Sequence, residues 1–151
     1  MEDGPMKMIL GLTVAVIAAL AIACGGDDDD DTATIDVSLA EWSVTPSSTS
    51  ATAGDVTFSV TNNGEEPHEF LVIRTDLAAD ALPTDDDGKV PEEEIDLIDE
   101  VEPFAPGTTE EITLNLDAGS YVLICNIVEL VPGEEPESHY RQGMRTSFTV
   151  E

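Results

Sequence analysis

The chain has 151 residues, with 33 acidic and 5 basic side chains and a formal net charge of −28. After an N-terminal targeting segment and a linker are set aside, this length suffices for one domain with one core. The negative charge makes nucleic acid and anionic lipid head groups poor partners, and it suits a basic partner or a high-salt medium. Because the acids are spread along the chain, solubility or adaptation to salt is favoured over a specific docking role.

Residues 8–23 form an uninterrupted apolar stretch that ends at Cys24 and is followed by GGDDDDD. The stretch is typical of a secretory signal, because a spanning helix needs about 20 residues. It resembles a bacterial lipoprotein signal. The resemblance implies a signal at 1–23, a lipid on Cys24, an acidic flexible linker at 24–33 and an exported protein anchored to the extracytoplasmic face of the membrane. An uncleaved anchor and an ordinary cleaved signal stay open as alternatives.

The rest of the chain, from residue 34 to 151, reads as short strands separated by Gly, Asn and Pro turns. Alternating or continuous apolar residues predict strands at 34–44, 56–62, 69–75, 111–117, 120–126 and 145–150. The stretch at 120–126 is apolar enough to be a buried central strand. This pattern predicts an all-β domain, an antiparallel Greek-key β-sandwich of about seven to eight strands.

Residues 75–104 show no strand alternation and carry many of the acids. We expect an acidic insertion on the sandwich, partly helical, with short helices at 76–82 and 91–98. Its DDDGKVPEEE stretch invites comparison with a calcium-binding EF-hand loop. Pro83 would occupy the first ligand position and cannot coordinate through its side chain, so a solvated acidic loop is favoured, with partner docking left open.

Once the signal and Cys24 are set aside, the chain retains two histidines, one cysteine and one methionine: His68, Cys125, His139 and Met144. Two imidazoles, a thiolate and a weak thioether are the ligands of a type 1 (blue) copper centre. If Cys24 is lipidated, Cys125 has no partner for an internal disulfide. Each residue alone would more often be structural, but their joint scarcity favours one metal site.

Two segments carry a resemblance to the plastocyanin-like cupredoxins: NNGEEPHEFLV, and GSYVLICNI with the later HYRQGM. The resemblance implies an eight-stranded Greek-key sandwich with one type 1 copper ion at one end, held by His68, Cys125, His139 and Met144. In that family the second histidine follows the cysteine closely and exposes the edge through which electrons leave. Here residues 126–138 intervene, and their apolar side chains either form a docking lip or pack against the 75–104 insertion.

The resemblance implies a membrane-tethered electron carrier that shuttles single electrons between redox proteins. We expect a monomer that is not an enzyme, because the sequence offers no third histidine for another copper type, no nucleophile with a spare histidine and no phosphate loop. The alternative is an extracytoplasmic copper storage, delivery or sensing protein with the same fold.

Three residues near the last two ligands need an explanation of their own. Arg141 and Arg145 bracket Met144, and we expect them to pair with the abundant acids, although steering of an acidic partner stays open. Tyr140, next to His139, is expected to serve in packing and not as an electron relay.

Overall fold

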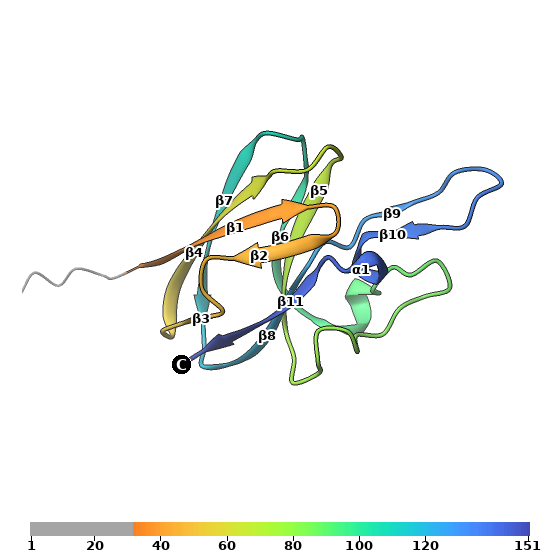
Figure 1. Cartoon of the computed structure of the whole chain (residues 1–151). Coiled ribbons are helices and arrows are strands. Elements are labelled where there is room, and N and C mark those ends of the chain that lie inside the picture. The colour runs from red at the N-terminus through yellow and green to blue at the C-terminus, as the bar shows by residue number, and fades with distance from the viewer. Residues whose placement is uncertain (1–31) are drawn as a thin grey trace, which may run out of the picture.

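The computed structural model describes residues 32–151, which fold into two packed β-sheets (Figure 1). The four-stranded sheet has the order β2 (Ser43–Pro46), β1 (Ala33–Ala40), β4 (Gly54–Asn62) and β7 (Thr109–Leu116). The five-stranded sheet has the order β3 (Ser50–Ala51), β11 (Arg145–Val150), β8 (Gly119–Ile124), β5 (His68–Arg74) and β6 (Asp96–Phe104). The remaining elements are a small hairpin, β9 (Val128–Glu129) with β10 (Glu137–Ser138), the 3-10 turn η1 (Glu92–Glu94) and the short helix α1 (His139–Gln142).

The β-sandwich predicted from the sequence is confirmed. Three of the eleven strands in the described residues are two residues long, which leaves eight longer strands, as the resemblance implied. The sheets are mixed and not purely antiparallel, because β1 pairs with β4 and β3 pairs with β11 in parallel.

The strand expected at 34–44 is in fact two strands. β1 and β2 form an antiparallel hairpin joined by a turn at Glu41 and Trp42. Neither residue is a turn former such as Gly, Asn or Pro, so the sequence carried no local signal for this turn. The turn brings both side chains to the same end of the sandwich as His68 and His139.

The main core lies between the two sheets. In β4, Val56, Phe58 and Val60 are fully buried and alternate with half-buried polar residues. Phe58 packs against Phe70 and Phe148 of the opposite sheet, with ring centroids 5.4 Å apart in both pairs. Burying side chains of this size stabilises the fold by roughly 1.5–3 kcal/mol each, so the alternation in β4 directly specifies which face joins the core.

Strands β5 and β8 are buried on both faces, which explains their continuous apolar sequence. Their outward-facing residues Leu71, Ile73, Val122 and Ile124 belong to a second cluster with Leu82, Val90 and Tyr140. The polypeptide between β5 and β6 therefore covers the outer face of the sheet. The prediction of a buried central strand at 120–126 is confirmed.

The interpretation of residues 75–104 as an insertion without strands is wrong in part. Residues 96–104 form the edge strand β6, residues 76–82 are not helical, and the predicted helix at 91–98 shrinks to η1. The alternation of β6 is hidden for two reasons. Edge strands tolerate charges on both faces, and the pairing of β6 with β5 shifts register twice, which interrupts the period of two.

The predicted signal at 1–23, the lipidated Cys24 and nearly all of the linker at 24–33 lie outside the described residues, and β1 already begins at Ala33. Within residues 32–151, no helix has both the length and the apolar character needed to cross a membrane.

Candidate metal centre

The four predicted ligands converge at one end of the sandwich. His68 is the first residue of β5, Cys125 directly follows β8, His139 opens α1, and Met144 lies between α1 and β11. All four have no exposed surface, and Met144 shares the main core cluster with Cys125. Residues 57 and 71 positions apart in sequence thus meet in one buried site.

Three donor atoms point at a common centre. The Nδ1 atoms of His68 and His139 are 3.2 Å apart, and Sγ of Cys125 lies 3.4 Å from Nδ1 of His139 and 3.9 Å from Nδ1 of His68. Metal bonds of about 2.0 Å to nitrogen and about 2.3 Å to sulfur would separate such donors by roughly 3.3 to 3.7 Å. The triangle therefore matches one small ion, and the donor set of two imidazoles and a thiol fits a single type 1 copper site.

Short local structure holds the last two ligands in place. The N–H of Cys125 donates to the carbonyl of Met144, and the N–H of Met144 donates to the carbonyl of His139. Ser138 caps α1 through the N–H of Arg141, and Gly143 ends the helix with φ of 134°. A side chain at Gly143 would be strained at that φ and would press against the carbonyl of Trp42, so this return turn requires glycine.

Burial sets the protonation of the donors. It raises the pKa of the Cys125 thiol to about 12, against the backbone N–H groups that would lower it. Burial lowers the pKa of His68, and burial together with the neighbouring His68 lowers the pKa of His139 to about 4. Both imidazoles are therefore neutral and free to coordinate near pH 7, whereas the thiol keeps its proton until a metal displaces it.

Glu41 is the outer partner of His68. Its Oε1 lies 2.9 Å from Nε2 of His68, a close but bent contact outside strict hydrogen-bond geometry. The same carboxylate accepts the backbone N–H groups of Glu65 and Glu66, and a side chain at Gly64 would collide with it. Burial acts to raise the pKa of Glu41, but those N–H donors outweigh it and lower the pKa. An acceptor in this position orients a metal-ligating imidazole.

His139 is covered, which differs from the exposed edge that the resemblance implies. The whole residue has 0% exposure, and the Trp42 ring stands edge-on to the imidazole with centroids 5.0 Å apart. The aromatic cover comes from the β1–β2 turn that the sequence did not reveal. This histidine therefore has no solvent-exposed edge.

The loop at 126–138 packs at its base and is exposed at its tip. The side-chain amide of Asn126 forms hydrogen bonds with the main-chain N–H and carbonyl of Val90, at 2.8 and 2.9 Å. The hydroxyl of Ser138 donates to the carbonyl of Gly88. Beyond them the β9–β10 hairpin projects from the body of the molecule (Figure 1), with Leu130 65% and Val131 48% exposed. The predicted packing against the 75–104 segment is therefore confirmed for the base of the loop, and the docking lip stays a prediction for its exposed tip.

The residues of α1 hold the segment between β5 and β6. The buried Tyr140 accepts the N–H of Leu82 and donates to the carbonyl of Ala79, so its expected packing role is confirmed. The expectation that Arg141 and Arg145 pair with acids is wrong. Arg141 binds the carbonyls of residues 85 and 86 and the hydroxyl of Thr84, and Arg145 binds carbonyls of α1 while stacking on Tyr140. A main-chain carbonyl in a closed turn is already held in place, whereas a surface ion pair must order two long side chains. A guanidinium therefore binds such carbonyls at a smaller cost in side-chain entropy.

The acidic stretch at 85–94 forms a closed turn. The N–H of Asp85 donates to the carbonyl of Lys89, and the Asp85 carboxylate accepts the N–H of Lys89. Within residues 32–151, the two clusters of metal-ligating side chains are His68–Cys125–His139 and Glu66–Glu129–His139, and neither contains a residue of this stretch. The solvated-loop interpretation is thus favoured over calcium binding.

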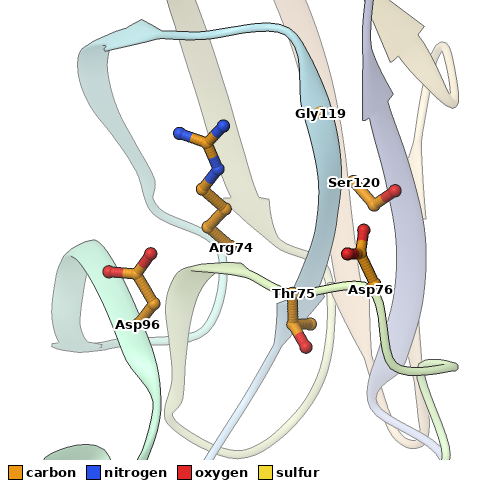
Figure 2. A pocket seen from close by; sticks show the side chains of 6 residues that line it. All are labelled: Arg74, Thr75, Asp76, Asp96, Gly119 and Ser120. Carbon is orange, nitrogen blue, oxygen red and sulfur yellow. The ribbon is translucent and has the colours of Figure 1, made fainter.

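A pocket of about 280 Å³ lies at the opposite end of β5 and β8, roughly 20 Å from the metal end by strand length (Figure 2). It is lined by Arg74, Thr75, Asp76, Asp96, Gly119 and Ser120. The guanidinium of Arg74 is engaged by Asp117 and by the carbonyl of Ala118. This polar hollow carries none of the donors of the metal centre.

No family model and no curated protein matches the sequence. Among solved structures, the fold is similar to sodium dithionite-reduced auracyanin from the photosynthetic bacterium Roseiflexus castenholzii, with 21% identity, a TM-score of 0.53 and coverage of 80% of this chain and 98% of that one. It is also similar to auracyanin B, with 20% identity, a TM-score of 0.51 and coverage of 78% and 88%. These likenesses show the fold.

Fold and donor set together define the class. The chain has the cupredoxin β-sandwich, and at one end of it His68, Cys125 and His139, with Met144 close by, fit a single type 1 copper site.

Proposed function

We propose that the protein is a blue copper electron carrier that passes single electrons between redox proteins and performs no substrate turnover of its own. The observation that carries the proposal is the convergence of two Nδ1 atoms and one Sγ atom in a fully buried site. When bound, copper would supply a one-electron couple between its cuprous and cupric states. His68, Cys125, His139 and Met144 are the residues that would hold it.

The chain supports this role by keeping its donors still. Cys125 and His68 continue rigid central strands, and His139 and Met144 are tied to Cys125 through a chain of backbone hydrogen bonds. Ligands that do not move between the two oxidation states keep the reorganisation of an electron carrier small. Complete burial of the donors also excludes water from the site.

Burial argues against the alternative of copper delivery. A protein that hands metal on needs ligands that a partner can reach, whereas all four side chains here are inaccessible. A slow exchange of bound copper with an external chelator would agree with a carrier, and rapid exchange would favour storage or delivery.

The test of the metal site is optical. We expect the metal-free full chain to turn blue with one equivalent of cupric ion, because thiolate-to-copper charge transfer absorbs visible light strongly. Cys125→Ser should remain colourless, and Cys24→Ser is the matched control that should turn blue. A colourless wild-type protein, or colour that survives Cys125→Ser, would contradict the proposal. Reversible one-electron voltammetry of the blue form then tests the carrier role.

We further propose export and anchoring through a lipid on Cys24, supported by the signal-like sequence that precedes it. Membrane fractionation tests this, since Cys24→Ser should move the protein from the membrane fraction to the soluble fraction. A wild-type protein that is already soluble would contradict the anchor.

For the redox partner we propose a basic protein that docks on the β9–β10 hairpin. The hairpin tip presents Leu130 and Val131 among the exposed Glu134 and Glu135. Electron transfer to a cationic cobalt complex should slow with Glu134→Gln/Glu135→Gln and much less with Asp76→Asn/Glu151→Gln at the far end. Equal effects of both pairs would mean that only the overall charge matters.

A further inference from the structure

The outer edge of His139 faces a cluster of carboxylates. Glu66 and Glu129 each place an oxygen within 4.8 Å of a ring nitrogen of His139 and of one another. Glu137 lies directly opposite Glu129 across the β9–β10 pair. In the described part of the chain, the ion pairs made by Lys and Arg lie elsewhere, at Arg74 and Lys89.

These carboxylates repel one another. Burial raises the pKa of Glu66, and the charges of Glu129 and Glu137 raise it further. Like charges directly opposite on an antiparallel pair are destabilising. Acidic clusters are common on so acidic a surface. What distinguishes this cluster is the ring nitrogen of His139 beside it.

Nε2 of His139 is buried and has no hydrogen-bond partner in the protein. Solvent cannot supply one, because the residue is completely inaccessible. The nearest carboxylate atom recorded for it, Oε2 of Glu66 at 3.9 Å, is itself buried without a partner. Buried polar atoms are nearly always hydrogen-bonded, and an unpaired one calls for an explanation such as an ion. Here two such atoms face each other.

The neighbouring polar groups favour a lone pair on this nitrogen in the metal-free protein. The Glu41 carboxylate can only accept, so its oxygen 2.9 Å away favours the tautomer of neutral His68 that carries the proton on Nε2 and leaves Nδ1 as an acceptor. The 3.2 Å contact between the two Nδ1 atoms is then satisfied when His139 donates from its own Nδ1. A neutral imidazole with a proton on Nδ1 has a free lone pair on Nε2, directed at Glu66 and Glu129.

We propose that Glu66, Glu129 and Nε2 of His139 form a second, outer metal site for a divalent transition-metal ion. One imidazole nitrogen with two carboxylates is a ligand set that suits Zn²⁺ and Cu²⁺. The outer site exists only while the inner site is empty, because coordination through Nδ1 moves the ring proton to Nε2, which then donates towards Glu66.

Incoming copper binds first at the outer site and then moves to the inner one, a role that rests on the copper function proposed above. The outer site lies beside the buried donors and within a negative field that concentrates cations. Inward transfer breaks the bonds to Nε2 of His139 and to the carboxylates of Glu66 and Glu129, and it forms bonds to Nδ1 of both histidines and to Sγ of Cys125. The thiol proton leaves to water, and the ring proton of His139 moves from Nδ1 to Nε2.

Zinc calorimetry tests the outer site without copper. In the metal-free full chain carrying Cys125→Ser, which weakens the inner site, we expect one equivalent of Zn²⁺ to bind. Adding Glu66→Gln/Glu129→Gln should weaken binding by about ten-fold or more. Adding Asp76→Asn/Glu151→Gln removes the same charge from the far end of the molecule and should change affinity less than about two-fold. Unaltered affinity in the first pair, or equal losses in both, would overturn the site.

Stopped-flow mixing with Cu²⁺ tests the loading role in protein that retains Cys125. Glu66→Gln/Glu129→Gln should slow the appearance of the blue band by about ten-fold at limiting copper and leave the final band unchanged. Equal rates in this pair and in Asp76→Asn/Glu151→Gln would overturn the loading role. If no protein turns blue, the copper function fails, and the zinc result still decides the outer site. Thermal unfolding of each metal-free variant confirms that it is folded.

Discussion

The side-chain amide of Asn126, the residue after the predicted thiolate ligand, forms two hydrogen bonds with the main chain of Val90. Its oxygen accepts the N–H of Val90 at 2.8 Å, and its nitrogen donates to the carbonyl of Val90 at 2.9 Å. The two residues are 36 positions apart and both are buried. Through this contact the segment between β5 and β6 is fastened to the loop that carries Cys125. The segment is thus part of the support of the metal centre.

The two hydrogen bonds between Asn126 and Val90 should stabilise the fold. Asn126→Ala should destabilise the metal-free protein by about 2 to 4 kcal/mol, because it leaves two buried main-chain groups unpaired. Asn63→Ala, which removes only an exposed contact to Ser38, should change stability by less than about 1 kcal/mol. Urea unfolding measures both. Similar losses of stability in the two variants would show that the hydrogen bonds between Asn126 and Val90 do not stabilise the fold.

Glu41 should tighten metal binding through His68. Glu41→Ala removes the acceptor behind the imidazole and should lower copper affinity by about ten- to one hundred-fold. Glu65→Ala is the control, since Glu65 is exposed and contributes its main-chain N–H, not its side chain, to the contact with Glu41. Competition with a chelator measures the affinities. An unchanged affinity for Glu41→Ala would mean that the contact is incidental.

Met144 should tune the reduction potential without being needed for the fold. Met144→Leu conserves volume and should cost less than about 1.5 kcal/mol. Loss of the thioether removes a donor that favours cupric copper, so the potential should rise while the blue colour persists. Voltammetry decides the matter, and a potential equal to that of the wild-type protein would place Met144 outside the coordination sphere.

Trp42 should shield His139 from solvent. Trp42→Ala uncovers the imidazole, and we expect chelators to remove copper about ten-fold faster, because the apolar surroundings of a metal site limit access to it. Trp42→Phe keeps an aromatic cover and should stay close to the wild-type rate. Equal rates in all three proteins would show that the metal leaves by another route.

Copper uptake should release one proton at pH 8. The free Cys125 thiol, with a pKa of about 12, holds its proton there, whereas Glu69, whose pKa burial raises to about 7, is already ionised. Affinity should therefore rise about ten-fold per pH unit below the thiol pKa. Protonation of His139 competes only below about pH 4. Calorimetry in buffers of different ionisation enthalpy counts the protons, and a count of zero would mean a thiol already ionised.

Several features could be predicted from local sequence alone. Strands such as β4 and β11 carry their own alternation, so each states which side chains face the core. The metal donors could be nominated because His68, Cys125, His139 and Met144 are the only histidines, cysteine and methionine that follow Cys24 in the sequence. Residue type and period are properties of a segment by itself, and they survive without knowledge of its neighbours.

Tertiary structure alone decided the surroundings of those donors. The strand at 96–104 is recognisable only through its pairing with β5, because charges and register shifts remove its pattern. The positions of Glu41 and Trp42 depend on a turn without a turn residue, and the burial of His139 depends on Trp42 standing against it. Such contacts join residues distant in sequence, and their energies arise only after the chain has folded, so no local pattern records them.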